Sequence, residues 1–85
     1  MIHEERSRVS NETQNMTRAI DSLREELEAV DWYNQRADAC TDPELKEILI
    51  HNANEEKEHA SMLLEWIRRH DEKFDHELKD NLFQE

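Results

Sequence analysis

The 85-residue sequence contains no glycine and only one proline. These residues form most tight turns, so their scarcity, with charged residues at 39% of the chain, favours long helices over sheets. No apolar run approaches the roughly 20 residues that span a bilayer, and no hydrophobic leader follows Met1. We therefore expect a cytosolic, cytoplasmic protein without a membrane partner.

Cysteine is nearly absent as well, because Cys40 is the only one. A disulfide within the chain is excluded, and we expect Cys40 to be a small residue near a helix end, with an intermolecular bridge as the alternative. In a chain of this size, with apolar residues at 35%, one hydrophobic core rarely gives enough stability alone. Metal binding and oligomerisation remain as sources of stability.

Basic residues are half as numerous as acidic ones. The chain has 11 Lys and Arg against 22 Asp and Glu, which gives a formal net charge of −11. A surface of this sign repels phosphate backbones, so we expect no nucleic acid partner. It instead raises the local concentration of cations.

The apolar pattern predicts two long helices. Residues 1–10 are polar and lack a period, so we expect a flexible N-terminal arm before one helical hairpin domain over residues 11–85. In the first helix, over residues 11–39, the apolar positions alternate between spacings of three and four, with Asn34 filling the one gap: Met16, Ile20, Leu23, Leu27, Val30 and Ala37. The second helix extends to about residue 70, and its apolar face contains Leu45, Ile48, Leu49, Leu63, Trp66 and Ile67.

A tight turn separates the two helices. Thr41 and Glu44 fit a capping box, whereas Asp42 followed by Pro43 fits an N-cap with proline at the first helical position. Either cap starts the second helix within a residue, and so short a connection makes the helices antiparallel. Beyond them, apolar residues at spacing four predict a short third helix or a continuation of the second: Phe74, Leu78 and Leu82.

Two polar residues lie within the apolar face of the second helix. With Leu45 as the origin of a helical wheel, Glu56 falls at about 20° and His59 at about −40°. A carboxylate buried without a partner costs several kcal/mol, so some group must compensate Glu56. It could reach the edge of the helix or hydrogen-bond His59 in a polar layer. Alternatively it binds a metal, because Glu-x-x-His places a carboxylate and an imidazole on one helix face.

Glu26 faces inward from the first helix. On a wheel with Leu23 as the origin it lies at about −60°, between Val30 and Tyr33. One inward glutamate plus one Glu-x-x-His is half of the ligand set in ferritin-like di-iron bundles. A two-fold pair of chains would supply four carboxylates and two neutral imidazoles, whose charge two ferrous ions neutralise. We therefore predict an all-α hairpin that dimerises into a ferritin-like four-helix bundle and binds metal.

Two stretches, residues 25–33 and 51–59, resemble the signature segments of the encapsulated ferritins, and the similarity extends from about residue 18 to 83. The resemblance implies a helical-hairpin protomer, a ferroxidase centre between two protomers and a ring of ten subunits inside an encapsulin shell. It implies iron, two ions per dimer, bound by Glu26, Glu56 and His59. Tyr33 would lie next to the centre and take part in catalysis.

The resemblance also implies two peripheral sites for calcium or other divalent cations. One, a metal-uptake site, would use three residues on the face of the first helix opposite its apolar stripe: Glu25, Glu28 and Trp32. The other, between subunits, would use three residues on an outer face of the second helix: His51, Glu55 and Glu58. The alternative for both is a solvated acidic face, although an exposed tryptophan calls for a partner surface.

The predicted activity is that of an oxidoreductase, a ferroxidase that oxidises Fe(II) with dioxygen or peroxide and feeds iron storage in the lumen of an encapsulin compartment. Members of that family usually continue into a shell-targeting tail, and no such segment follows Gln84 and Glu85, so encapsulation rests on the resemblance. Two alternatives stay open. One is a structural hairpin dimer whose buried polar layer fixes register; the other is a module that binds zinc or manganese without redox turnover.

Overall fold

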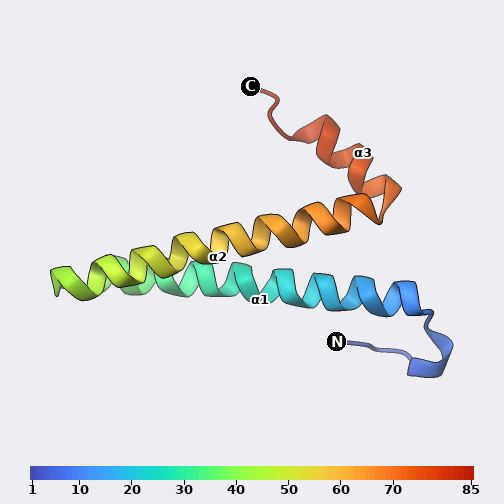
Figure 1. Ribbon diagram of the computed structural model, residues 1–85, viewed down its shortest axis with the longest axis horizontal. Helices are drawn as coiled ribbons and strands as arrows, with labels where there is room; N and C mark the ends of the chain where they lie inside the picture. Colours follow the sequence, from blue (N-terminus) through green and yellow to red (C-terminus); the bar gives the residue numbers. More distant parts are fainter.

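The computed structural model describes all residues, 1–85, and every regular element in it is helical. A 3-10 turn, η1 (Arg6–Arg8), precedes the helices α1 (Asn11–Ala39), α2 (Pro43–Arg69) and α3 (Glu72–Asn81). Helices α1 and α2 lie side by side as an antiparallel hairpin, and α3 turns away from it (Figure 1). The predicted fold class, an all-α hairpin with a short third helix, is confirmed.

The turn between α1 and α2 begins at Cys40, which is half-buried, as expected for a small residue at a helix end. Asp42 Oδ1 accepts a hydrogen bond from the backbone N–H of Leu45 at 2.9 Å, and Pro43 is the first helical residue. Of the two predicted caps, Asp42 with Pro43 is correct, and Thr41 lies outside the helix. Because the connection is so short, α2 must run back along α1.

A seam of small side chains holds the hairpin together. Only 5 of the 85 residues are buried, four alanines and one isoleucine: Ala19, Ala37, Ala53, Ala60 and Ile67. The three from α2 are spaced by seven, so they return to the same helix face every two turns. Small side chains at the contact let two helices approach closely. So small a core fits a chain that needs further contacts to be stable.

The larger apolar side chains lie beside this seam, which differs from the predicted apolar faces. Ile20 and Leu27 of α1 are 39% and 55% exposed, and Leu45 and Ile48 of α2 are 48% and 51% exposed. The reason is angular. On the wheel of α2 the buried residues centre near 60°, whereas the large apolar ones extend to about −60°, and one neighbouring helix covers only part of that arc. A single chain therefore leaves apolar flanks open.

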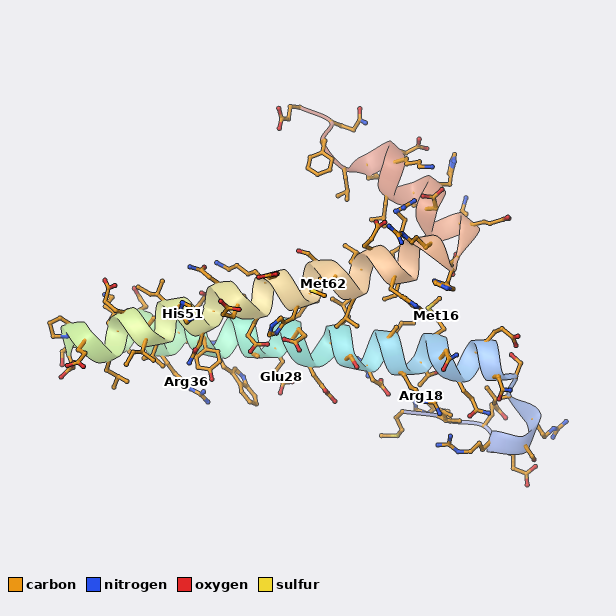
Figure 2. All side chains as sticks on the ribbon, viewed as in Figure 1. Met16, Arg18, Glu28, Arg36, His51 and Met62 are labelled. Carbon is orange, nitrogen blue, oxygen red and sulfur yellow. The ribbon has the colours of Figure 1, made fainter.

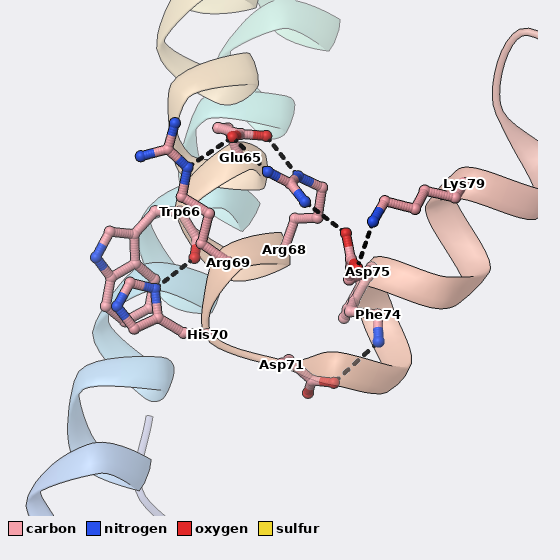
Figure 3. A network of polar contacts seen from close by, with 9 residues as sticks. All are labelled: Glu65, Trp66, Arg68, Arg69, His70, Asp71, Phe74, Asp75 and Lys79. Atoms are coloured by element: carbon pink, nitrogen blue, oxygen red, sulfur yellow. Dashed lines mark hydrogen bonds and ion pairs between the residues drawn. The ribbon is translucent and has the colours of Figure 1, made fainter.

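Helix α3 joins the hairpin through charged groups at the end of α2 (Figure 3). Arg68 donates from Nε to Glu65 at 2.7 Å and also pairs with Asp75 of α3. Arg69 donates to the same Glu65 at 2.7 Å, and Lys79 donates to Asp75 at 2.9 Å. Hydrogen bonds from Arg68 and Arg69 lower the pKa of Glu65 to about 2. Those from Lys79 and Arg68 lower the pKa of Asp75.

At the other end, Ser10 caps α1 by accepting a hydrogen bond from the N–H of Thr13 at 3.1 Å. The preceding residues fold back beside α1, where the amino group of Met1 pairs with Asp21 (Figure 1). The helix thus begins where the predicted arm ends, and the flexibility of that arm stays a prediction. None of the three helices combines the length and apolarity that a bilayer crossing requires.

Candidate metal centre

Glu26 of α1 meets Glu56 and His59 of α2 across the hairpin. One ligand atom from each residue lies within 4.8 Å of the other two. His59 Nδ1 is 3.4 Å from Glu26 Oε2 and 3.6 Å from Glu56 Oε2. No other group of three His, Cys, Asp or Glu side chains in the chain is placed to hold a metal ion. The structure therefore brings together the three residues that the sequence singled out first.

Helical register places these side chains at the alanine seam. Glu56 follows Ala53 by three residues and precedes Ala60 by four, so all three share one face of α2. Glu26 follows Ala19 by seven residues, two turns along the same face of α1. Because the alanines hold the two helices close together, carboxylates on their faces must approach one another. The sequence positions of the small residues thus fix the position of the site.

Glu26 is an unsatisfied carboxylate. Its Oε2 atom is buried and has no hydrogen-bond donor, although His59 Nδ1 lies 3.4 Å away. The side chains of Glu26 and Glu56 are each 24% exposed, and that of His59 is 47% exposed. A buried acceptor without a donor costs about 1–3 kcal/mol. A cation would satisfy it, and two carboxylates with an imidazole suit several divalent first-row metals.

Three side chains from one chain leave the site open. His59, nearly half exposed, lies at about −40° on the wheel of α2. The open apolar residues Leu45 and Ile48 lie at about 0° and −60° on the same wheel, on the same side of α2 but 14 and 11 residues before His59. The site and an unpacked apolar flank therefore share one side of α2. A surface placed against that flank would cover both.

The remaining residues predicted around the centre do not join this cluster. Tyr33 lies two turns beyond Glu26 on α1 and is half-buried. Its ring centroid is 5.8 Å from the guanidinium carbon of Arg36, and that of Trp32 is 5.6 Å from the same atom. Arg36 was not singled out from the sequence. Its position three and four residues after two aromatic residues nevertheless indicates that it can contact both on the helix surface.

The predicted peripheral sites are exposed surface within one chain. On α1, Glu28 points away from α2, on the same side as Arg36 (Figure 2). Glu25 is also exposed, and Trp32 is 49% exposed. On α2, His51 Nε2 is 3.5 Å from Glu55 Oε1. Glu58 is exposed, and no third ligand completes a group there. Cation binding at either patch stays a prediction.

The chain is similar in sequence to one protein family over its whole length and to two curated proteins over most of it. A sequence model of the EncFtn-like family matches residues 1–85. An encapsulated ferritin-like protein of Rhodospirillum rubrum is 59% identical over 83 residues, 98% of this chain and 59% of that protein. A ferritin-like protein of Thermotoga maritima is 46% identical over 81 residues, 95% of this chain and 71% of that protein. The chain thus spans about 59% of the length of the Rhodospirillum rubrum relative.

Among solved structures, the crystal structure of a protein from Nitrosomonas europaea has the same fold. It gives a TM-score of 0.96 at 65% sequence identity, and the match covers 99% of this chain and 92% of that one.

Proposed function

Because this chain belongs to the EncFtn-like family, whose members include encapsulated ferritin-like proteins, we propose that it is a ferroxidase. It oxidises Fe(II) to Fe(III) at a di-iron centre built between two copies of the chain. The observation that carries this proposal is the cluster of Glu26, Glu56 and His59 with its unsatisfied carboxylate oxygen.

The second copy follows from the incompleteness of the site. One chain offers two carboxylates and one imidazole and leaves the metal accessible from the apolar flank of α2. A two-fold axis through that flank doubles the set to four carboxylates and two imidazoles, the composition of ferritin-like di-iron sites. Four negative charges balance two ferrous ions. The same contact buries apolar side chains that one chain leaves exposed, including Leu45 and Ile48.

Within this site the residues have different tasks. Glu26 of each chain would be shared between the two metal positions, while Glu56 and His59 of one chain would together hold one ion. Each Fe(II) loses one electron, and the pair reduces dioxygen to hydrogen peroxide with two protons. Carboxylates are hard ligands and favour Fe(III), which drives the step. Tyr33, two turns from Glu26 along α1, would lie next to the centre in the paired chains.

Storage requires a separate compartment. A pair of helical hairpins encloses no space for a mineral, so oxidised iron must leave for another container. The relative from Rhodospirillum rubrum is named as encapsulated. We therefore propose that this chain works in the lumen of an encapsulin shell within the cytoplasm. The resemblance to the encapsulated ferritins further implies a ring of dimers, ten chains in all. The outer acidic patches of α1 and α2 would collect cations before they reach the centre.

An iron titration tests the proposal. Fe(II) is added without oxygen, air is admitted, and ferric absorbance is followed. The ligand count predicts about one iron per chain, oxidised rapidly. Glu26→Ala, Glu56→Ala and His59→Ala should each abolish this, while Glu47→Ala, an exposed acid elsewhere on α2, should not.

The two alternatives give different results in this titration. If the cluster is only a polar layer that fixes register, the three alanine variants will assemble as well as the parent, and the parent will bind no stoichiometric iron. If it is a redox-silent metal site, iron will bind at about one per chain and oxidise no faster than in buffer.

A further inference from the structure

The chain has only three aromatic rings that lose an electron readily: Trp32, Tyr33 and Trp66. Two of them share one cation, because the guanidinium carbon of Arg36 is 5.6 Å from the Trp32 ring centroid and 5.8 Å from that of Tyr33. The third, Trp66, stacks on His70 with ring centroids 3.9 Å apart. Arg36 therefore contacts the two rings of α1 and not Trp66.

Arg36 is unusual among the arginines of this acidic chain. It is the only basic residue between Arg24 and Lys46, in a segment rich in Asp and Glu. Nevertheless it forms no ion pair and no hydrogen bond with a carboxylate, whereas Arg24 pairs with Asp21 at 2.9 Å. The side chain with the widest choice of acidic partners lies over two rings instead.

The position of Arg36 relates those rings to the metal centre. Tyr33 lies on the face of α1 that carries Glu26, two turns further along. Trp32 is on the outer face, 49% exposed. On the wheel with Leu23 as origin, Arg36 falls near −140°, between Trp32 at about 180° and Tyr33 at about −80°. The positive charge of Arg36 thus lies between Trp32 on the outer surface and Tyr33 on the face that carries Glu26.

A fixed positive charge beside a ring opposes the removal of an electron from that ring. When a ring gives one electron to an oxidant it first becomes a radical cation, and tyrosine then releases its phenolic proton to water. In both cases positive charge develops at the ring as the electron leaves, and a neighbouring guanidinium repels that charge. The neutral ring, in contrast, is attracted to the cation.

We propose that Arg36 protects Trp32 and Tyr33 against one-electron oxidation. This inference rests on the proposed function for its source of oxidant: Fe(II) reduces the hydrogen peroxide formed at the centre to hydroxide and a hydroxyl radical, and that radical takes one electron from a ring and becomes hydroxide. The lower tendency of the two rings to lose an electron does not depend on bound metal, so it can be measured in the metal-free protein. In function, Arg36 ensures that the electrons consumed at the centre come from iron and not from the protein.

The test compares Arg36→Met, which keeps the bulk and loses the charge, with Arg36→Lys, which keeps the charge. Metal-free proteins react with hexachloroiridate(IV), an anionic oxidant that accepts one electron, and mass spectrometry of peptides quantifies oxidation of each ring. Trp66 is the internal reference. In Arg36→Met, oxidation of Trp32 and Tyr33 relative to Trp66 should rise about two- to fivefold, the factor for ~0.5–1 kcal/mol at about 1.4 kcal/mol per tenfold. Arg36→Lys should stay near the parent.

Charge steering cannot imitate this result. Loss of a positive charge from an acidic chain repels an anionic oxidant more strongly and slows the reaction, opposite to the expected change. Arg24→Gln removes the same charge from α1 without touching a ring and should give the ratios of the parent. Equal increases in the Met and Lys variants would show that bulk shields the rings and would overturn the proposal. Unchanged ratios in both would also overturn it.

A second arm uses iron. During aerobic Fe(II) oxidation, Arg36→Met should accumulate more oxidised Trp32 and Tyr33 than the parent while it oxidises iron at the same initial rate. If the parent does not oxidise iron, the proposed function fails, and the hexachloroiridate ratios still decide whether Arg36 protects the rings. If iron is oxidised but the ring ratios match the parent in both arms, only the protective role of Arg36 fails.

Discussion

Glu26 and Glu65 are glutamates of the same hairpin, and their surroundings are opposite. Glu65, at the joint between α2 and α3, accepts hydrogen bonds from Arg68 and Arg69, each at 2.7 Å. Glu26, at the middle of the hairpin, has a buried oxygen with no donor. Arg68 and Arg69 supply the positive charges at the joint, whereas no Lys or Arg side chain pairs with Glu26. This difference supports a structural role for Glu65 and the proposal that Glu26 binds a cation from outside the chain.

Alanine at the two glutamates should separate these roles most strongly. Glu26→Ala should lower the rate of iron oxidation by 100-fold or more, on the order of what loss of a metal ligand or its support costs. The metal-free variant should melt a few degrees higher, because about 1 kcal/mol or more of unsatisfied burial is relieved. Glu65→Ala should keep the oxidation rate and loosen α3. Stopped-flow absorbance and thermal unfolding measure both, and equal loss of activity in the two variants would remove the distinction.

The open flank beside the centre is the next point to test. Ile48→Glu places a charge at the proposed dimer contact, where an unpaired buried charge costs several kcal/mol, so association should weaken by about 100-fold or more. Iron binding should fall with it if the site is shared between two chains, as proposed. Light scattering over a dilution series, with iron content per chain, gives both quantities. Gln35→Glu adds the same charge on an exposed part of α1 and should change neither; full iron binding by Ile48→Glu monomers would contradict the shared site.

The alanine seam can be widened without touching a ligand. Ala53→Leu inserts bulk where the side chain is 2% exposed, and overpacking of this kind costs about 1–3 kcal/mol. As the helices separate, Glu26 should move away from Glu56 and iron affinity should drop. Asn54→Leu, one residue further and exposed, is the matched control. Calorimetric iron binding and thermal unfolding measure the change; a stable, widened hairpin with unchanged affinity would mean that the seam does not position the site.

Low pH should weaken the contact between α2 and α3, and we expect this effect to be smaller than those of the substitutions above. Hydrogen bonds from Arg68 and Arg69 lower the pKa of Glu65 from 4.5 to about 2. A carboxyl whose folded pKa is depressed stabilises the fold above its unfolded value and loses this contribution as pH falls through the folded value. The docking of α3 should therefore weaken between about pH 4.5 and 2. Fluorescence of Trp66, next to the joint, should report it, and Arg68→Met should shift the transition to higher pH; a transition unaffected by Arg68→Met would assign it to other groups.

Much of this arrangement could be predicted from the sequence, for identifiable reasons. Periodicity predicted α1 and α2 because no glycine interrupts them, and the wheel predicted that Glu56 and His59 share the face of α2 that meets Glu26. The seam could not be predicted, since Ala53 and Ala60 carry a weak hydropathy signal next to leucines that dominate the pattern. The choice of Asp42 as cap over Thr41 depended on backbone geometry at the turn. The joint at Glu65 also escaped prediction, because exposed charges do not reveal their partners.

The central claim is that one chain holds half of a di-iron site. Native mass spectrometry of protein loaded with Fe(II) without oxygen, recorded across a dilution series, tests it directly. The account predicts two irons on each dimer and none on the monomer, with both the iron and the dimer lost together in His59→Ala at concentrations where metal-free chains are monomeric. Iron bound to monomers at one per chain, or dimers that stay free of iron under saturating Fe(II), would contradict it.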